Sequence, residues 1–503
     1  MAIENSGVLP DVFTEYRKKS EPLREKPRAT LPKPEKASLP PMIPESELPA
    51  QEAPFEIPTT YDAFEKAIVD PVKNFVPNPP PFPENTASVH PFKGGEDSSH
   101  ERLAHLLKSE VMVNYKDTRN GLLGRDFSTK LSAFLAQGCI TARQIHEEMA
   151  KYEDGKDSAY ENVKGYGEGE NDGTKAVRFE LLWRDFMRLW TQKVKSRLFR
   201  LEGYRRQEHY KDGEQKPKWK TADEKHALPA QEPGPAEVTK ILERFNAGTT
   251  GMGFIDASQR ELIHSGYTSN RARQNVASFL AKHLGIDWRY GAEWYEMLLV
   301  DYDVSSNWAN WQYVAGVGND PRGPDRIFNP VKQAFDYDKE GLYVKAWVPE
   351  VRNLEKLENV FQAWTTPEEE LEKAGLVGNV MVTDPIKRIE FFVEGKPRSS
   401  KRPYGRRRGS TRRPQQGNSP EGQSTGGQSS APAQQPTGPP SGPSGAPPNR
   451  GGYPRGGGYR GGYRGRGGGG YRGRGYGGGR GAFRGGYMGP PRPSWAPPAN
   501  AGA

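Results

Sequence analysis

The sequence has 503 residues but only one cysteine, Cys139. A single thiol excludes a disulfide framework and a cysteine-rich zinc site, and it is typical of a reducing intracellular compartment. No run of about 18 apolar residues occurs, so the sequence predicts no membrane span. The polar start MAIENSGVLPD is not a signal peptide, and no metal-binding motif is found. We therefore expect an intracellular, soluble protein without a bound metal.

Apolar residues are scarce as well. They make up 34% of the chain, beside 58 glycines and 45 prolines, so a large part of the chain cannot form packed core. Charge is unevenly distributed: from Lys401 onward there are 16 arginines, one lysine and a single acidic residue, Glu421. This tail carries about +16 against +9 for the whole chain, which leaves about −7 on residues 1–400.

Composition predicts four regions along the chain. Residues 1–85, rich in Pro, Lys and Glu, are expected to form an extended linker with one short helix at Tyr61–Val69. Residues 86–352 have the apolar spacing of long helices and form the predicted main domain. Residues 353–399 are expected to be an extension, and residues 400–503 a disordered, basic tail, because Gly, Arg, Ser, Gln and Pro cannot bury a core.

Helical signals dominate the main domain. Ser98 or Ser99 is a candidate cap for a first helix, Thr141 caps ARQIHEEMAKYE, and Gly285 is a plausible C-cap for SNRARQNVASFLAKHLG. In KAVRFELLWRDFMRLWTQKV the large apolar residues recur on one side. Convincing period-two strands are missing, so the predicted fold class is all-α.

Two stretches have the residue types of a binding site. Ser128, Thr129 and Ser132 surround the start of a predicted helix, where free N–H groups and the helix dipole favour a phosphate or pyrophosphate. Ordinary capping is the alternative. Glu180 and Arg184 lie one helical turn apart, with a tryptophan between them, and here the alternative is an exposed ion pair.

Two further stretches complete the pattern. In TSNRARQNVASFL, Asn270, Arg273 and Gln274 share a helix face, and Asp301 is the obvious buried acid for Arg273 to meet. The segment DYDVSSNWANWQYVAGVGND combines acids, amides and aromatic residues in one short reach. Such a segment is expected to line something flat and polar.

In order and spacing these stretches resemble the flavin-binding domain of the photolyase and cryptochrome family, specifically cryptochrome DASH of fungal type. The resemblance covers roughly residues 85 to 350 and rests on YKDTRNGLLGRDFSTKLSAFLAQGCIT, FELLWRDFMR, GMGFIDASQREL, GYTSNRARQNVASFLAKHLGIDWRYGAEWYEMLLVDYDVSSNWANWQYVAGVGNDPRG and RIFNPVKQAFDYDKEG. It implies a helical domain that binds FAD.

The resemblance assigns roles to individual residues. It implies that the ribityl and pyrophosphate of FAD are held by Tyr115, Ser128, Thr129, Lys130, Leu131 and Ser132, with Arg184 also at the cofactor. Arg273 paired with Asp301 is expected beside the isoalloxazine, with Asp303 accepting from N3–H and Asn307 facing N5. Asparagine at that last position is typical of photolyases, whereas plant photoreceptor cryptochromes have aspartate.

Further roles concern electrons and substrate. Trp311 and Trp288 match the inner members of a tryptophan relay, with Trp219 the expected outer member. The catalytic pocket for a flipped-out pyrimidine dimer is implied at Glu180, Trp183, Asn270 and Gln274. Gln274 matches the DASH type. Histidines at positions 270 and 274, typical of six-four photolyases, are absent.

The sequence departs from the family at its start. Full-length members begin with an α/β antenna domain that binds a folate, methenyltetrahydrofolate, whereas here LPDVFTEYRK already resembles the linker after that domain. A truncated gene model, a fragment and a natural short form all remain open. Nuclear or cytoplasmic residence is expected, and organellar targeting cannot be read from this start.

Repeated Arg-Gly-Gly in the tail alternates with five tyrosines, Tyr453, Tyr459, Tyr463, Tyr471 and Tyr476. Guanidinium charge and stacking rings favour RNA or single-stranded DNA as partners, with a merely solvated, phase-separating tail as the alternative.

The leading hypothesis is an FAD-dependent photolyase, acting as a monomer on cyclobutane pyrimidine dimers in single-stranded or looped DNA. One rival is a blue-light photoreceptor that also binds RNA through its tail. Another is an RNA-binding protein with a vestigial flavin domain.

Overall fold

The computed structural model describes residues 9–50, 56–73, 81–205 and 218–391. The chain divides into two units, Met1–Pro403 and Tyr404–Ala503, and every described residue belongs to the first. The predicted tail therefore lies outside the described residues. Those residues form helices and turns, with one isolated parallel bridge between Lys220 and Ile286 in place of any sheet. The all-α prediction is confirmed for this part of the chain.

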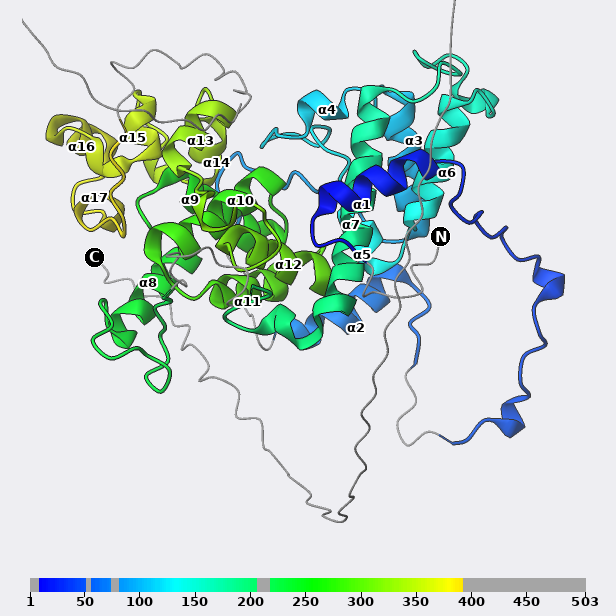
Figure 1. The fold of residues 1–503 in the computed structure, drawn as a ribbon, viewed down its shortest axis with the longest axis horizontal. Helices are drawn as coiled ribbons and strands as arrows, with labels where there is room; N and C mark the ends of the chain where they lie inside the picture. Colours follow the sequence, from blue (N-terminus) through cyan, green and yellow to red (C-terminus); the bar gives the residue numbers. More distant parts are fainter. Residues whose placement is uncertain (1–8, 51–55, 74–80, 206–217, 392–503) are drawn as a thin grey trace, which may run out of the picture. The chain divides into compact units, whose positions relative to one another are not determined.

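The helices follow one another in the order labelled in Figure 1. The first eight are α1 Phe13–Ser20, α2 Tyr61–Lys73, α3 Glu96–Lys108, α4 Tyr115–Thr118, α5 Ser132–Gln137, α6 Ala142–Glu153, α7 Asp172–Val194 and α8 Pro235–Ala247. The remainder are α9 Gly253–Ser265, α10 Asn270–Ser278, α11 Trp288–Leu298, α12 Val304–Ala315, α13 Pro330–Tyr337, α14 Leu342–Trp347, α15 Leu357–Phe361, α16 Glu368–Ala374 and α17 Val380–Thr383. No described helix combines the length and apolarity needed to cross a bilayer.

Local sequence explains several helix ends. Thr141 forms a capping box with Gln144 at the start of α6, as predicted. The predicted cap at Ser98 or Ser99 is wrong, because α3 begins after Gly95 and the buried Ser99 hydroxyl donates to the carbonyls of Glu96 and Cys139. Gly285 does end its helix in the left-handed region, but the last turn is a π-helix rather than a continuation of α10.

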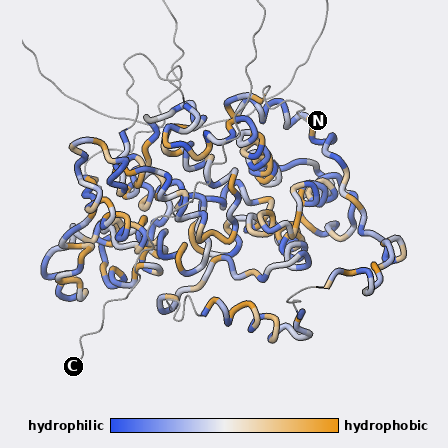
Figure 2. Tube along the Cα trace, turned by 90° about the horizontal axis from the view of Figure 1, so that it is seen from below, coloured by the Kyte–Doolittle hydropathy of each residue, from blue (hydrophilic) through white to orange (hydrophobic). Residues whose placement is uncertain are grey.

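The main core forms around α12. This helix packs against α7, α10 and α11, and the largest fully buried side chains of the surrounding helices include Trp190, Trp288 and Trp347. Figure 2 shows polar and apolar residues alternating in short stretches along the chain, as expected for helices that bury one side. A second cluster gathers buried residues of α3, α5 and α6.

A glycine sets the closest approach in this core. On Gly291 of α11, a Cβ atom would stand 2.2 Å from Cη2 of Trp311 on α12. The indole of Trp311 therefore lies directly on the backbone of α11, one turn after Trp288. Any residue other than glycine at this position would place its Cβ atom in the Trp311 ring and force the ring to move.

The N-terminal segment is part of the domain. Phe13 of α1 is 6% exposed and packs edge-on against Trp183 of α7, with ring centroids 4.4 Å apart, while Leu9 is 2% exposed. The predicted extended linker over residues 1–85 is wrong for this stretch, because Leu9, just before α1, and Phe13, its first residue, are buried in the main core. The predicted helix from Tyr61 is present and extends to Lys73.

Past residue 352 the same core continues. Leu354, Phe361, Leu376 and Met381 are buried in the main cluster. Phe361 belongs to α15 and Met381 to α17, while Leu376 follows α16. The predicted domain end at 352 thus falls inside packed chain, because the short helices there have too few turns to show a clear apolar period.

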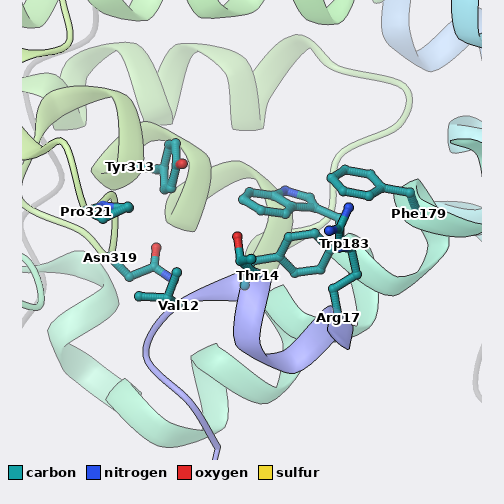
Figure 3. Close-up of a pocket in the computed structure, with 9 residues that line it drawn as sticks. Val12, Thr14, Arg17, Phe179, Trp183, Tyr313, Asn319 and Pro321 are labelled. Atoms are coloured by element: carbon teal, nitrogen blue, oxygen red, sulfur yellow. The ribbon is translucent and has the colours of Figure 1, made fainter. Parts of the chain in front are cut away.

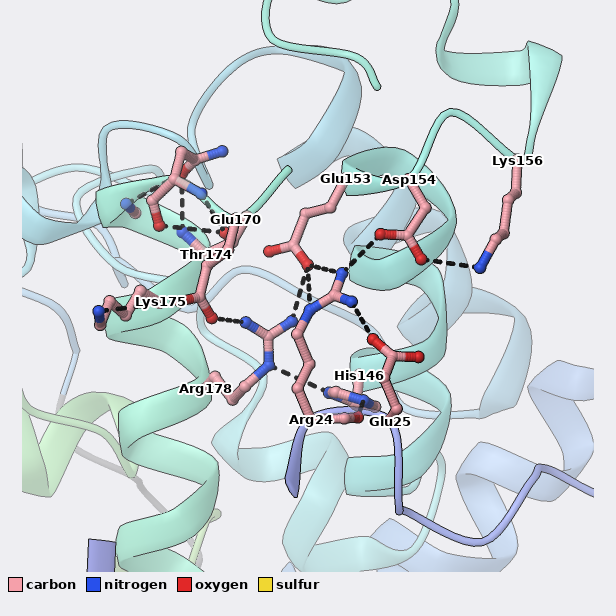
Figure 4. A network of polar contacts seen from close by, with 12 residues as sticks. Arg24, Glu25, His146, Glu153, Asp154, Lys156, Glu170, Thr174, Lys175 and Arg178 are labelled. Atoms are coloured by element: carbon pink, nitrogen blue, oxygen red, sulfur yellow. Dashed lines mark hydrogen bonds and ion pairs between the residues drawn. The ribbon is translucent and has the colours of Figure 1, made fainter. Parts of the chain in front are cut away.

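A polar network fastens the N-terminal segment to α6 and α7 (Figure 4). The carboxylate of Glu153, fully buried, accepts from Arg24 at 2.5 Å and from Arg178 at 2.9 Å. The ring of His146 links both arginines: its Nδ1 accepts from Arg178 Nε, and its Nε2–H donates to the carbonyl oxygen of Arg24. The ring must be neutral to accept at Nδ1.

Burial and the neighbouring Arg178 guanidinium lower the pKa of His146 below 6.5. Below about pH 6.5 the unfolded chain therefore binds a proton that the folded chain excludes, and the free energy of unfolding falls with the pH. In the His146→Gln variant the amide can accept and donate without titrating. We expect its melting temperature to fall less than that of the wild type between about pH 7.5 and about pH 5.5.

Some pH dependence should remain in that variant, because burial also lowers the pKa of His90 and His283. The exposed His226, substituted in the same way, is the matched control and should follow the wild-type curve. Parallel curves for His146→Gln and wild type would show that the network tolerates a charged ring.

Candidate functional site

Three helices bring the predicted site residues together. The central helix α12 supplies Asn307 and Trp311, and it packs against α7, which carries Glu180, and α10, which carries Arg273. These side chains are separated by up to 131 positions in the sequence, yet they come from helices in direct contact. Residues from separate stretches of the sequence therefore lie on helices that contact α12.

A buried ion pair lies at the start of this site. Arg273 Nη2 stands 2.9 Å from Oδ2 of Asp301, whose side chain is 4% exposed, and Arg273 Nε donates to the carbonyl of Thr268 at 2.8 Å. Burial opposes the charge on Arg273, but Asp301 beside it raises the arginine pKa overall. The other oxygen of Asp301, Oδ1, is buried and has no hydrogen-bond partner among the described residues.

The turn after Asp301 is organised by α12 itself. Asp303 is the N-cap of this helix and accepts from the amide of Ser306 at 2.8 Å and from Arg188 at 3.0 Å. Burial pushes the pKa of Asp303 upward, but these two donors hold it below its ordinary value. One turn on, Asn307 Nδ2 donates to the carbonyl of Ala292, which fixes the amide plane and leaves its Oδ1 facing away from α11.

The predicted phosphate loop is held from behind by an arginine that the sequence analysis missed. Arg102 of α3, 3% exposed, donates to the carbonyls of Arg125, Ser128 and Thr129 and pairs with Asp126 at 2.6 Å. Because one guanidinium takes up these carbonyls, the loop shape is set before any ligand arrives. The only sign of this role in the sequence was that Arg102 is a charged residue on the apolar side of a helix.

After this loop the chain does not enter a long helix. Lys130 adopts a left-handed backbone conformation, with φ of 57°, and its ammonium lies 4.4 Å from the ring of Tyr267. Leu131 is buried and precedes α5, which begins at Ser132 and spans six residues. A helix this short has a weak dipole. Donors to a phosphate at this place would therefore be hydroxyl groups and single backbone N–H groups.

Glu180 does not pair with Arg184. Its carboxylate meets Arg119 at 2.5 Å, while Arg184 donates to the carbonyl of Leu135 at the end of α5. The exposed ion pair considered for Glu180 and Arg184 is therefore wrong, because the two side chains leave α7 toward different neighbours. Burial raises the pKa of Glu180 in spite of Arg119, and burial together with Glu180 raises that of Tyr115.

Trp183 lies between aromatic side chains of two other helices. Its ring centroid is 5.7 Å from that of Tyr313 on α12, edge to face, and Phe13 covers it from α1. Figure 3 shows this surface, where a shallow cavity of about 220 Å³ runs past Trp183 toward Asn319 and Pro321. Tyr313 was noted in the sequence only as one aromatic residue among several, and its contact with Trp183 depends on how α7 crosses α12.

The face of α10 carries the remaining predicted pocket residues. Asn270 is exposed at the first position of the helix, and Gln274 accepts from Arg271 at 3.1 Å. Arg271, which the sequence analysis did not assign, also reaches Asn120 at 2.8 Å and lies 4.2 Å from the ring of Tyr337. The exposed face of α10 is therefore polar, and Arg271 gives it a positive charge held in place by its neighbours.

The predicted tryptophans cluster along α11 and α12. Trp311 touches α11 at Gly291, and Trp288, fully buried, lies one turn earlier on that helix. Trp219 is 8% exposed and is kept near Trp288 by the bridge beside it, since Asp287 N donates to the carbonyl of Lys220. In the described part of the chain, no three His, Cys, Asp or Glu side chains gather as a metal site.

Comparisons with known proteins agree with this geometry. Residues 177–390 match a family model described as the FAD binding domain of DNA photolyase. A protein of Neurospora crassa named cryptochrome DASH, mitochondrial, is 64% identical over 411 residues, which cover 81% of this chain and 55% of the relative. A cryptochrome DASH of Gibberella zeae is 57% identical over 396 residues, covering 78% and 56%.

Among solved structures, a cryptochrome of Synechocystis sp. matches with a TM-score of 0.53 and 35% identity, over 74% of this chain and 65% of that one. The chain spans about half the length of the two fungal relatives. From the matched domain, the identities and the shared helical architecture, this chain belongs to the photolyase and cryptochrome family, in its cryptochrome DASH branch.

Proposed function

We propose that this protein binds FAD and uses light to split cyclobutane pyrimidine dimers, with single-stranded or looped DNA as the preferred substrate. The observation that carries the proposal is the pair of Arg273 and Asp301, buried next to a helix that also positions Asn307 and Trp311. Family membership supports the cofactor and the DNA substrate class, and the residues themselves support the roles below.

The residues fit a flavin. Asp301 keeps one buried oxygen without a partner, so it can accept from an N–H of a bound ligand while its other oxygen neutralises Arg273. A fixed guanidinium beside the ring favours a negative charge on a reduced flavin. Bound FAD would supply a light-absorbing one-electron donor. The chain supplies the charge next to it, the Asn307 amide and the preformed loop behind Ser128 and Thr129.

Glu180 and Trp183 supply the proposed contacts to substrate. They lie one turn apart on α7, so a carboxyl group and an indole face the same side of the helix. The carboxyl group of Glu180 can hydrogen-bond an extruded base, and Trp183 can stack on that base. Asn270, Gln274 and Arg271 extend this surface along α10.

The tryptophans serve, in this proposal, to return the flavin to its reduced state. Electrons would reach it through Trp311, Trp288 and Trp219. Trp311 lies on α11 at Gly291, one turn after Trp288, and a backbone bond between Asp287 and Lys220 joins the segments of Trp288 and Trp219.

Charge reversal tests the cofactor site. Arg273→Glu places a second carboxylate against Asp301, and breaking a buried pair costs about 3–5 kcal/mol. We expect the purified variant to lose the visible flavin absorbance that we expect of the wild type. The control is Lys240→Glu, an exposed reversal on α8, which should keep it. Full flavin occupancy in Arg273→Glu would place the cofactor elsewhere.

Removal of a substrate contact tests repair. Glu180→Ala deletes one hydrogen bond from a carboxyl group, for which about 1.5–3 kcal/mol is typical, so repair of a dimer-containing oligonucleotide should slow about ten- to a hundredfold. Flavin content should not change. Asp172→Asn, exposed on the same helix, is the matched control. If flavin is lost together with activity, Glu180 has a structural role instead.

The tail is the proposed second nucleic-acid surface. Deleting Ser400–Ala503 removes 16 arginines and one lysine. Affinity for single strands should drop, and the dependence of the logarithm of affinity on that of salt should flatten, by about 0.7 for each phosphate no longer neutralised. The flavin spectrum should stay. An unchanged salt dependence would contradict a binding role for the tail.

A further inference from the structure

A fourth tryptophan, Trp308, lies against the proposed relay. It comes from α12, is 6% exposed, and its ring meets that of Trp288 edge to face with centroids 5.8 Å apart. It lies one turn before Trp311 on the same helix. On its outer side it packs against Phe199, which is 44% exposed. Trp308 thus connects the buried Trp288 with the protein surface.

The indole N–H groups of these two tryptophans have different partners. Trp288 Nε1 donates to the backbone carbonyl of Leu201 at 3.1 Å, and an amide oxygen is too weak a base to take the proton. Trp308 Nε1 donates to a carboxylate oxygen of Glu296 at 2.8 Å. Glu296 is exposed, and it also bonds with Tyr302. Only the second arrangement provides a proton acceptor within hydrogen-bond reach.

We infer that Trp308 and Glu296 form a proton-coupled exit from the tryptophan relay, which branches at Trp288. The inference rests on the proposed function, since it takes the positive hole on Trp288 as its oxidant. One electron passes from Trp308 to the Trp288 radical cation, which becomes neutral again. The Nε1 proton of Trp308 moves to Glu296, leaving a neutral indole radical and a carboxylic acid.

The branch would lengthen the lifetime of the charge-separated state, in which the flavin holds the electron and a tryptophan is oxidised. A neutral radical on Trp308 no longer attracts the electron that has left, and return requires Glu296 to give the proton back. An external thiolate completes the cycle: it supplies one electron to the radical, Glu296 returns the proton, and the thiolate becomes a thiyl radical. The backbone bond from Asp287 N–H to the Lys220 carbonyl joins the segment of Trp219 to that of Trp288, so an exit through Trp219 would act beside this one.

The test uses the full chain with FAD bound, blue light and dithiothreitol as the thiol. Trp219→Phe should retain part of the photoreduction rate, and adding Trp308→Phe should remove what is left. In Glu296→Gln, transient absorption should show the indole radical cation where the wild type shows the neutral radical. Glu293→Gln, which removes a charge from the exposed side of the same helix, should behave as the wild type.

A readout without illumination guards against misfolding. In an NMR spectrum of ¹⁵N-labelled protein, the indole N–H resonance of Trp308 should shift in Glu296→Gln and stay in Glu293→Gln. The inference is overturned if Trp308→Phe and Glu296→Gln leave rates and radical spectra unchanged while Trp288→Phe stops photoreduction. If Trp288→Phe itself photoreduces normally, the relay and this branch both fail.

Discussion

The contact of Trp311 with the bare backbone of α11 at Gly291 is the constraint on which the site depends. With a Cβ position only 2.2 Å from the ring, α11 and α12 approach as closely as a helix and an indole permit. That approach brings Trp288 against Trp308 and sets Asn307 within reach of the Ala292 carbonyl. Because protein interiors pack at near-crystalline density, a spacing fixed at one point is transmitted to each of these contacts.

Ion pairs between arginines and buried or partly buried carboxylates hold other segments of the domain in place. Glu153, Asp301 and Asp303 are all wholly or partly buried, and each carboxylate is matched by at least one arginine from a different segment. A buried carboxylate without its partner would be costly, so each pair commits the two segments to one arrangement. Such pairs specify position more than they add stability. That suits a domain whose site is assembled from helices far apart in sequence.

The sequence predicted those features of the fold and the site that depend on residues close together in the chain. Thr141 is followed by Gln144 at capping-box spacing, and Arg273 meets Asp301, the acid that the sequence suggested for it, in the turn after α11. Long-range partners were not readable. Arg119 for Glu180, Tyr313 for Trp183 and Arg102 behind the phosphate loop depend on how helices cross, which no periodicity encodes.

The same reasoning explains the missed N-terminal helix. Leu9 and Phe13 lie just before and at the start of a short polar helix that carries no apolar repeat, so their burial comes from the surface of α7 rather than from their own segment. Conversely, the segment 301–320 was recognisable because it combines residue types that loops rarely keep together. The role of each residue in it still required the three-dimensional arrangement.

Helix α12 has a consequence for how this protein can change. Asn307, Trp308 and Trp311 contact α11, Tyr313 meets α7, and the helix also packs against α10, so three neighbouring helices constrain it. Inserting or deleting one residue turns everything beyond it by about 100°. No side of α12 would absorb that turn. We therefore expect lineages of this domain to vary in loops and at the chain ends, while the length of α12 between Asp303 and Gly316 stays the same.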